Sequence, residues 1–264
     1  MANPGVAVAV SPHLDDAVFS VGGTLAALVA AGWTVRVVTC FTASMSDPSP
    51  FALACQLDKG FTADIDYMAL RRAEDEAACA VLGVEPTHLP LPEAPHRGYP
   101  DPAGLFAGVR GDDWAAAALI PALGPHLAHA DVVLAPQALG DHADHRIVTE
   151  TVARLAPDAL FWRDVPYVSR QPAAAPWRCV PAGVEAGVDI NDHLAVKMVA
   201  AGSYHSQLDF QFGPTGVAAL LRDLAAVEAA RLRLPGAVEA LRGRAERLAM
   251  IGAVSPPFRA SSAR

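Results

Sequence analysis

The sequence predicts a single α/β domain built on a doubly wound, mostly parallel sheet with helices on both faces, a Rossmann-like architecture. Its 264 residues are enough for one large core. Short runs rich in Val, Leu and Thr alternate along the chain with longer runs rich in Ala, Leu and Glu. Because strands that alternate with helices are joined by right-handed crossovers, this order predicts parallel strands. Hydrophobic residues make up 52% of the chain and charged residues 18%, so extended disorder is not expected.

The expected strands and helices follow from apolar runs bounded by turn residues. Strands are predicted at residues 6–10, 34–40, 87–91, 131–135 and 160–167, and helices at 23–31, 67–82, 113–127, 195–203 and 217–232. Gly32 and Gly83 follow the first two helices, at the position where a left-handed cap favours glycine. After about residue 156 the alternation weakens, and this part is expected to complete and cover the sheet.

The domain is expected to span residues 1–254, followed by a flexible tail over 255–264. Two connections, 44–64 and 90–111, are long for a compact α/β domain. Long connections near strand ends often form lids or binding loops, so both are candidates to contact a ligand.

Charge and composition exclude several classes of partner. The formal net charge is −8 and no block of like charge occurs, which argues against nucleic acid or anionic lipid and favours a small-molecule partner. No apolar run approaches the ~20 residues that span a bilayer, and the first residues lack a secretory signal, so a cytoplasmic protein is expected. The four cysteines form no CxxC pair, which predicts free thiols.

A first group of ionisable residues follows the first predicted strand, in the stretch SPHLDDAVFSVGG. His13, Asp15 and Asp16 fall in the loop at the carboxyl end of that strand, just before a helix. Two adjacent carboxylates on a partly buried edge repel each other and lose hydration unless a cation or several donors compensate. The alternative is structural: one Asp caps the helix and the other is solvated.

A second group, in DVVLAPQALGDHADHRIVTE over residues 131–150, repeats the order of strand, turn, ionisable residues and helix. His142 and His145 are three apart and therefore share one helix face. Because the carboxyl ends of parallel strands lie on one edge of a sheet, the two groups are expected to meet. His13, Asp16 and one histidine of this group would give three ligands and an open position, which is typical of catalytic zinc, although iron also accepts such ligands.

The two stretches PHLDDAVFSVGGTLA and HADH resemble the LmbE-like or PIG-L family of zinc-dependent N-deacetylases. The family signatures are Pro-His-x-Asp-Asp followed by Gly-Gly, and His-x-Asp-His. The segments LRRAEDEAACAVLGV, residues 70–84, and KMVAAGSYHSQ, residues 197–207, resemble two further family segments. The resemblance reaches from residue 6 to about residue 207.

The resemblance implies a role for each matching residue. The metal ligands would be His13, Asp16 and His145; the general base would be Asp15 and the general acid His142; Asp144 would orient an imidazole, and Arg71 would contact polar groups of the substrate. Gly22 and Gly23 would let a helix pack closely against the sheet. Some family members use a tyrosine to assist the oxyanion, but no tyrosine lies near the second motif here, which leaves that role unassigned.

Three further residues are expected to bind substrate. Glu93 and Arg97 lie in LPLPEAPHRGYP, residues 89–100, and Gln207 lies in the later segment. The family often has an acidic residue near Glu93 that meets sugar hydroxyls. Ordinary loop structure is the alternative for the first two.

The resulting prediction is hydrolysis of the N-acetyl or N-acyl group of an N-acetylglucosamine-type amino sugar in a small glycoconjugate or glycosylated natural product. One alternative is a zinc amidase acting on another N-acyl amine or a sugar-thiol conjugate. A non-catalytic nucleotide- or sugar-binding module is disfavoured, because no GxGxxG opens the first helix and acids stand where phosphates would bind.

Overall fold

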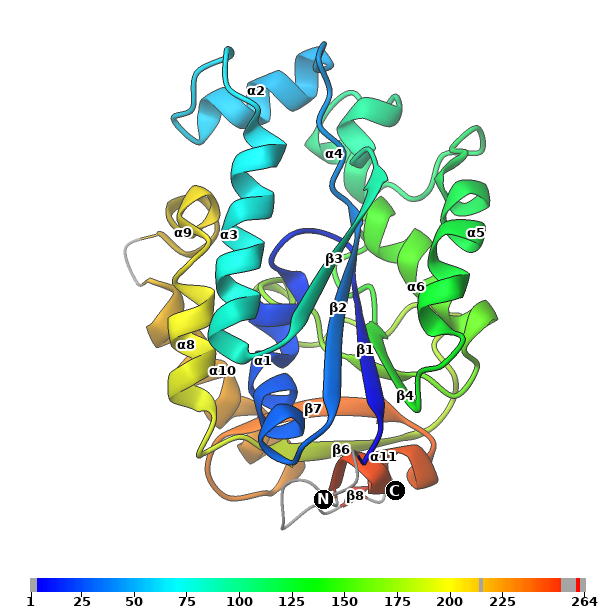
Figure 1. Cartoon of the computed structure of the whole chain (residues 1–264), viewed down its shortest axis with the longest axis vertical. Helices are drawn as coiled ribbons and strands as arrows, with labels where there is room; N and C mark the ends of the chain where they lie inside the picture. The colour runs from blue at the N-terminus through cyan, green and yellow to red at the C-terminus, as the bar shows by residue number, and fades with distance from the viewer. Residues whose placement is uncertain (1–3, 214–215, 253–259, 262–264) are drawn as a thin grey trace.

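The fold is built on one mixed sheet, seen in the computed structural model that describes residues 4–213, 216–252 and 260–261 (Figure 1). In the described part of the chain the sheet has eight strands in the order β3-β2-β1-β4-β5-β7-β6-β8. The strands are β1 (Val6–Ser11), β2 (Thr34–Phe41), β3 (Glu85–Leu91), β4 (Val132–Pro136), β5 (Leu160–Trp162), β6 (Val184–Asp189), β7 (Val238–Gly243) and β8 (Ala260–Ser261).

The strands β3, β2, β1, β4 and β5 are parallel, which confirms the predicted fold class. β1 lies inside this half, with Ser11 opposite Thr39 of β2 and Ala9 opposite Leu134 of β4. Its sequence VAVAVS is buried almost throughout, as expected for a strand covered on both faces. The carboxyl ends of β1 and β4 therefore lie side by side.

Helices cover both faces of the sheet, as Figure 1 shows. One face packs against α1, α3, α8 and α10, and the other against α5 and α6, each over its own hydrophobic cluster. The helices are α1 (Asp16–Ala30), α2 (Pro50–Asp58), α3 (Tyr67–Leu82), α4 (Pro102–Phe106), α5 (Ala115–Leu127), α6 (Ala143–Leu155), α7 (Tyr167–Arg170), α8 (Leu194–Ala201), α9 (His205–Phe212), α10 (Val217–Leu232) and α11 (Ala245–Gly252). No helix in the described residues is long and apolar enough to cross a bilayer.

The other half of the sheet differs from the expectation. β7 pairs antiparallel with β5, and β6 pairs antiparallel with β7 and β8. The predicted strand over 160–167 is only β5, because the chain leaves the sheet after Trp162 and enters α7 through a cis Val165–Pro166 bond. Of the predicted tail over 255–264, residues 260 and 261 form β8, and the others lie outside the described residues.

Helix α1 begins at Asp16, not at residue 23 as predicted. The helix is interrupted at Val21, whose φ of −129° is not helical, and its residues from Asp16 to Leu28 are all buried, so its first turns lack an amphipathic pattern. The carboxylate of Glu239 from β7 accepts hydrogen bonds from the backbone N–H groups of Gly23 (3.0 Å) and Thr24 (2.7 Å). The second part of α1 thus has its own N-terminal cap. The first part of α1 places Asp16 at the edge of the sheet.

Both long connections contain short helices. Residues 44–64 include α2, and residues 90–111 include the 3-10 helix Ala94–Arg97 and α4. In Figure 1, α2 and α4 lie beyond the carboxyl ends of β1, β2 and β3. They therefore enclose the edge at which the two motifs were expected to meet.

Gly23 allows α1 to pack against the strand layer. A Cβ at this position would lie 2.9 Å from three side-chain atoms of Ile190, which follows β6. At Gly22 the nearest atom would be Cγ of Lys197 at 3.2 Å. Of the two glycines, Gly23 has the closer obstacle.

We expect Gly23→Ala to lower the free energy of unfolding by about 1–3 kcal/mol, because the added methyl group overpacks the contact with Ile190. Urea unfolding followed by circular dichroism would measure the loss. Gly22→Ala is the matched control and should cost less, since its nearest contact is 3.2 Å and not 2.9 Å. An equal or larger loss for Gly22→Ala would contradict this account of the packing.

Candidate active site

A tight turn after β1 presents the first motif. The hydroxyl of Ser11 donates to the carbonyl oxygen of His13 (2.7 Å) and accepts from the backbone N–H of Ala17 (3.1 Å). Asp15 has a φ of 152°, a conformation that costs energy for a residue with a side chain. The turn therefore holds adjacent carboxylates in different directions at the start of α1.

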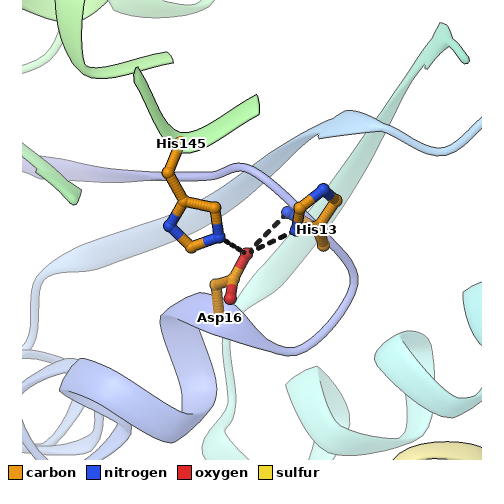
Figure 2. A group of neighbouring side chains, drawn as sticks. All are labelled: His13, Asp16 and His145. Carbon is orange, nitrogen blue, oxygen red and sulfur yellow. Dashed lines mark hydrogen bonds and ion pairs between the residues drawn. The ribbon is translucent and has the colours of Figure 1, made fainter. Parts of the chain in front are cut away.

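His13, Asp16 and His145 meet around one carboxylate oxygen, as Figure 2 shows. Oδ2 of Asp16 lies 3.2 Å from Nδ1 of His13 and 3.3 Å from Nε2 of His145. His145 stands in the first turn of α6, which follows β4, so the neighbouring strand ends bring the two motifs together. The structure thus unites the three residues expected to bind metal.

A second carboxylate orients each imidazole. Nδ1 of His145 lies 2.7 Å from Oδ1 of Asp164, and Nε2 of His13 lies 2.9 Å from Oδ2 of Asp144. Since an ionised carboxylate only accepts hydrogen bonds, these ring nitrogens carry the protons. The opposite nitrogens, Nε2 of His145 and Nδ1 of His13, face Asp16, and their lone pairs become available to a cation when these nitrogens carry no proton.

These donor atoms fit a divalent cation. Nε2 of His145 is buried and has no hydrogen-bond partner, which is costly for a polar atom unless another group binds it. The ligand atoms of His13, Asp16 and His145 lie within 4.8 Å of one another. Two imidazole nitrogens and one carboxylate oxygen suit zinc with an open position, and also suit iron.

A second group of possible ligands, His13, His142 and Asp144, is equally compact but less suited to metal. The carboxylate of Asp144 already accepts from Arg97 (2.6 Å) and from the backbone N–H of Ala94 (3.0 Å), besides its bond to His13. Its position supports the expected role of orienting an imidazole, which is that of His13.

The charges of the site favour a cation. Burial alone would lower the pKa of His145, but Asp16 and Asp164 outweigh it and raise the pKa to about 9. Burial would raise the pKa of Asp16, and the facing His145 and His13 instead hold it well below its usual range. The same pair of carboxylates that attracts a proton to His145 would attract a divalent ion in its place.

Asp15 stands beside the three candidate metal ligands. Its side chain is buried, and burial together with the neighbouring Asp16 raises its pKa to about 7. Its Oδ2 lies 3.6 Å from a guanidinium nitrogen of Arg71 and accepts from the amide of Gln211 at 3.3 Å. A carboxylate with this pKa can both take and return a proton near neutral pH.

His142 caps α6 with its side chain. Its Nδ1 accepts from the backbone N–H of Asp144 at 3.2 Å, so the neutral ring carries its proton on Nε2. Burial and the neighbouring His13 lower the pKa of His142 to about 3, which also favours the neutral ring. The general-acid role expected of His142 stays a prediction, and the neutral ring can also donate a hydrogen bond from Nε2.

A cavity of about 280 Å³ opens over these groups. Its walls include His13, Asp15, Asp16, His142 and Asp144, together with the predicted substrate residues Arg71, Glu93 and Gln207. The Arg71 guanidinium pairs with Glu93 (2.5 Å), and the Gln207 amide donates to the hydroxyl of Tyr67 (2.6 Å). These three side chains are therefore held in place at the wall.

Arg97 does not lie where a substrate-binding residue was expected. Its side chain is fully buried and pairs with Asp113 (3.0 Å) and Asp144 (2.6 Å), and it does not line the cavity. The loop that carries it folds back as a 3-10 helix and directs the guanidinium inward. Arg97 thus fixes the carboxylate that holds His13.

Two residues of the site were missed by sequence reasoning. Asp164 holds His145, and Tyr167 packs its ring edge-on against His145 at 5.1 Å and lines the cavity. Burial and the nearby Asp16 raise the pKa of Tyr167 well above its usual value, so the phenol remains a donor. Asp164 follows the end of β5 on the same sheet edge, so its place in the site could have been predicted from the sequence. The position of Tyr167 is set by the turn after that strand, which the sequence did not predict.

Comparison with known families identifies the chain. A family model described as "PIG-L: GlcNAc-PI de-N-acetylase" matches residues 8–156, more than half of the sequence, and includes both motifs. This chain belongs to the PIG-L family. The prediction of a metal-dependent N-deacetylase acting on amino sugars of the N-acetylglucosamine type is thereby confirmed.

Individual relatives agree with this assignment. The chain is 34% identical to the 2'-N-acetylparomamine deacetylase of Streptomyces fradiae over 221 residues, which are 78% of this chain and 74% of the relative. Its structure resembles that of the A40926 pseudoaglycone deacetylase, with a TM-score of 0.74, 25% identity and full coverage of both chains. It also resembles the zinc-inhibited form of a teicoplanin deacetylase, with a TM-score of 0.72 and 25% identity over 90% of this chain and 97% of the other.

We expect Asp164→Asn to weaken metal affinity by about 10–100-fold, because the ring of His145 loses the charged acceptor that fixes its tautomer. Competition with a chromogenic chelator would measure the affinity. Asp158→Asn, at an exposed carboxylate that pairs with Arg244, is the matched control and should retain the wild-type affinity. Equal affinities for wild type and Asp164→Asn would contradict the proposed orientation of His145.

Proposed function

We propose that this chain hydrolyses the N-acetyl group of an N-acetylglucosamine-type unit in a small glycoconjugate, releasing acetate and a free amine, with zinc held by His13, Asp16 and His145. The observation that supports it most is the buried Nε2 of His145, which has no hydrogen-bond partner and lies 3.3 Å from Asp16, beside the raised-pKa carboxylate of Asp15. A bound zinc ion polarises an amide carbonyl and acidifies water.

Asp15 is the proposed general base. Its carboxylate lines the cavity, where Arg71 and Gln211 also contact it. It takes a proton from the attacking water as the new bond to the carbonyl carbon forms. The same proton can then pass from Asp15 to the departing nitrogen, which leaves as a neutral amine.

Donors on the opposite wall would hold the oxyanion. Nε2–H of His142 and the phenol of Tyr167 both belong to the cavity wall, close to His145. Each can donate a hydrogen bond to the oxygen that gains charge when the amide carbon becomes tetrahedral. Tyr167 therefore fills the role that the sequence left unassigned.

We expect Asp15→Asn to retain its metal and lose about 10²–10⁴-fold in kcat for acetate release, because the amide cannot accept the proton of the attacking water. Metal analysis and an acetate assay on N-acetylglucosamine glycosides would check both statements. Asp141→Asn, directly before His142 and at an exposed ion pair with Arg146, is the control and should keep full activity. Unchanged turnover in Asp15→Asn would remove Asp15 from the reaction.

Removal of the metal tests the cofactor. Dialysis against a chelator should abolish acetate release, and one equivalent of Zn²⁺ should restore it, since the site offers two imidazoles and one carboxylate. Parallel addition of Fe²⁺ under anaerobic conditions compares the second metal that such ligands accept. Full activity of the metal-free protein, or recovery with Fe²⁺ alone, would contradict a zinc enzyme.

A further inference from the structure

A buried ion pair lies beside α1, outside the active cavity. Nζ of Lys197 in α8 lies 2.6 Å from Oε1 of Glu239 in β7. Both side chains are almost completely buried, and neither lines the active cavity. Burying two charges costs desolvation energy that can exceed their mutual attraction, so a buried pair is weak evidence for stability alone. The place of this pair in the fold indicates another role.

The pair contacts both sides of the break in α1 at Val21. In a regular helix the backbone N–H of Thr24 would donate to the carbonyl oxygen of Ser20, four residues earlier. Here that N–H donates to Oε2 of Glu239 (2.7 Å), and the carbonyl oxygen of Ser20 accepts from Nζ of Lys197 (3.4 Å). Glu239 also accepts from the hydroxyl of Thr24 (2.6 Å). The two charges therefore supply partners for backbone groups on either side of the break.

The aliphatic part of Lys197 lies next to this break. A Cβ on Gly22 would lie 3.2 Å from Cγ and 3.7 Å from Cδ of Lys197. The absence of a side chain at Gly22 thus gives the lysine room to reach Ser20. Both α8 and β7, which carry the two charges, pack against α1 (Figure 1). The break is therefore held by three elements of the core.

Ser20 connects the pair to the turn that follows β5. Its hydroxyl oxygen accepts a hydrogen bond from the backbone N–H of Val165 at 3.1 Å. Val165 directly follows Asp164, the carboxylate that holds His145. It also comes two residues before Tyr167, which lines the active cavity. Ser20 thus contacts the ion pair through its carbonyl group and this turn through its hydroxyl group.

Ser20 is also one helical turn from a proposed metal ligand. Asp16 begins α1, and Ser20 lies four residues later on the same face of the helix. One path therefore runs from Ser20 through the first turn of α1 to Asp16, and another runs through the turn after β5 to His145. The two paths end at atoms 3.3 Å apart, Oδ2 of Asp16 and Nε2 of His145. A shift of Ser20 would therefore change the distance between these two ligand atoms.

We propose that the ion pair of Lys197 and Glu239 positions the metal ligands from outside the active cavity, by fixing the break in α1. Ser20 transmits this position to Asp16 and, through the turn after β5, to His145. All three are positioning residues, since none of them lines the active cavity. This inference rests on the proposed function and adds to it a set of distant residues that the metal site requires. A pair that only stabilised the fold would affect the free energy of unfolding and leave the bound metal unchanged.

The first experiment removes the connection and leaves the ion pair intact. Ser20→Ala deletes the acceptor for the N–H of Val165. We expect the dissociation constant for Co²⁺ to rise about 2–30-fold, the range seen for changes along a coupled network. The visible absorption spectrum of bound Co²⁺, which depends on the ligand geometry, should also change.

Thr42→Val is the matched control for Ser20→Ala. It removes another buried hydroxyl, which donates to the backbone carbonyl of Leu89 (2.8 Å), and should leave the affinity and the spectrum of Co²⁺ unchanged. Wild-type affinity and spectrum in Ser20→Ala would overturn the proposal. An equal change in Thr42→Val would overturn it as well, because the effect would then follow from the loss of any buried hydroxyl.

The second experiment tests whether the pair and Ser20 act along one path. Lys197→Met removes the charge and keeps a long aliphatic side chain, and it should also raise the dissociation constant for Co²⁺. Loss of a positive charge by itself would attract the cation more strongly, so weaker binding reports position and not charge. Adding Ser20→Ala should not multiply the two factors, whereas full multiplication would overturn the shared path. Urea unfolding shows which variants are folded, and Ser20→Ala alone decides the question if Lys197→Met does not fold.

The third experiment measures acetate release from an N-acetylglucosamine glycoside at saturating Zn²⁺. Because Ser20 does not line the cavity, Ser20→Ala should lower kcat about 3–100-fold and keep KM within about twofold of the wild-type value. A rise in KM with unchanged kcat would overturn the positioning role. If the wild-type protein binds Co²⁺ and releases no acetate, the deacetylase function is rejected, and the Co²⁺ affinities still decide the positioning role. If it binds no metal, both proposals are rejected.

Discussion

The convergence of His13 and His145 on the carboxylate of Asp16 is the constraint on which the rest of the site depends. Both imidazoles approach the same oxygen atom from elements that are far apart in sequence and adjacent in the sheet. Buried negative charge of this kind is unfavourable without compensation. A divalent cation, or protonated histidines in its absence, supplies that compensation, so the fold and the metal site are coupled.

This constraint explains the buried charges around the centre. Asp144 and Asp164 each hold one imidazole by the nitrogen that faces away from Asp16, and Arg97 pairs with Asp144. Burying any one of these charged groups alone would cost free energy. Each of them instead forms a hydrogen bond or ion pair with a neighbouring group. The ring orientations are thereby set before a ligand binds, which is the preorganisation that a hydrolytic site requires.

The covering segments add selectivity to this centre. The connection that carries α2 and the connection that carries α4 lie over the carboxyl edge and enclose two adjoining cavities with different walls. Several apolar side chains border the space above the reacting groups, and polar and apolar side chains in similar number border the larger space. A division of this kind lets one reaction centre serve different glycoconjugates when only the covering segments change.

The sequence by itself determined the parallel half of the sheet, the helices over 67–82 and 217–232, and the meeting of two motifs at one edge. Those features depend on local patterns of apolar residues and on the rule that parallel strands end at the same edge. The tertiary structure decided the antiparallel strands β6 and β7, the inward turn of Arg97, and the contributions of Asp164 and Tyr167. These features depend on contacts between residues distant in sequence, because a strand partner, an ion pair or a ring contact is chosen by the space that the assembled core leaves open.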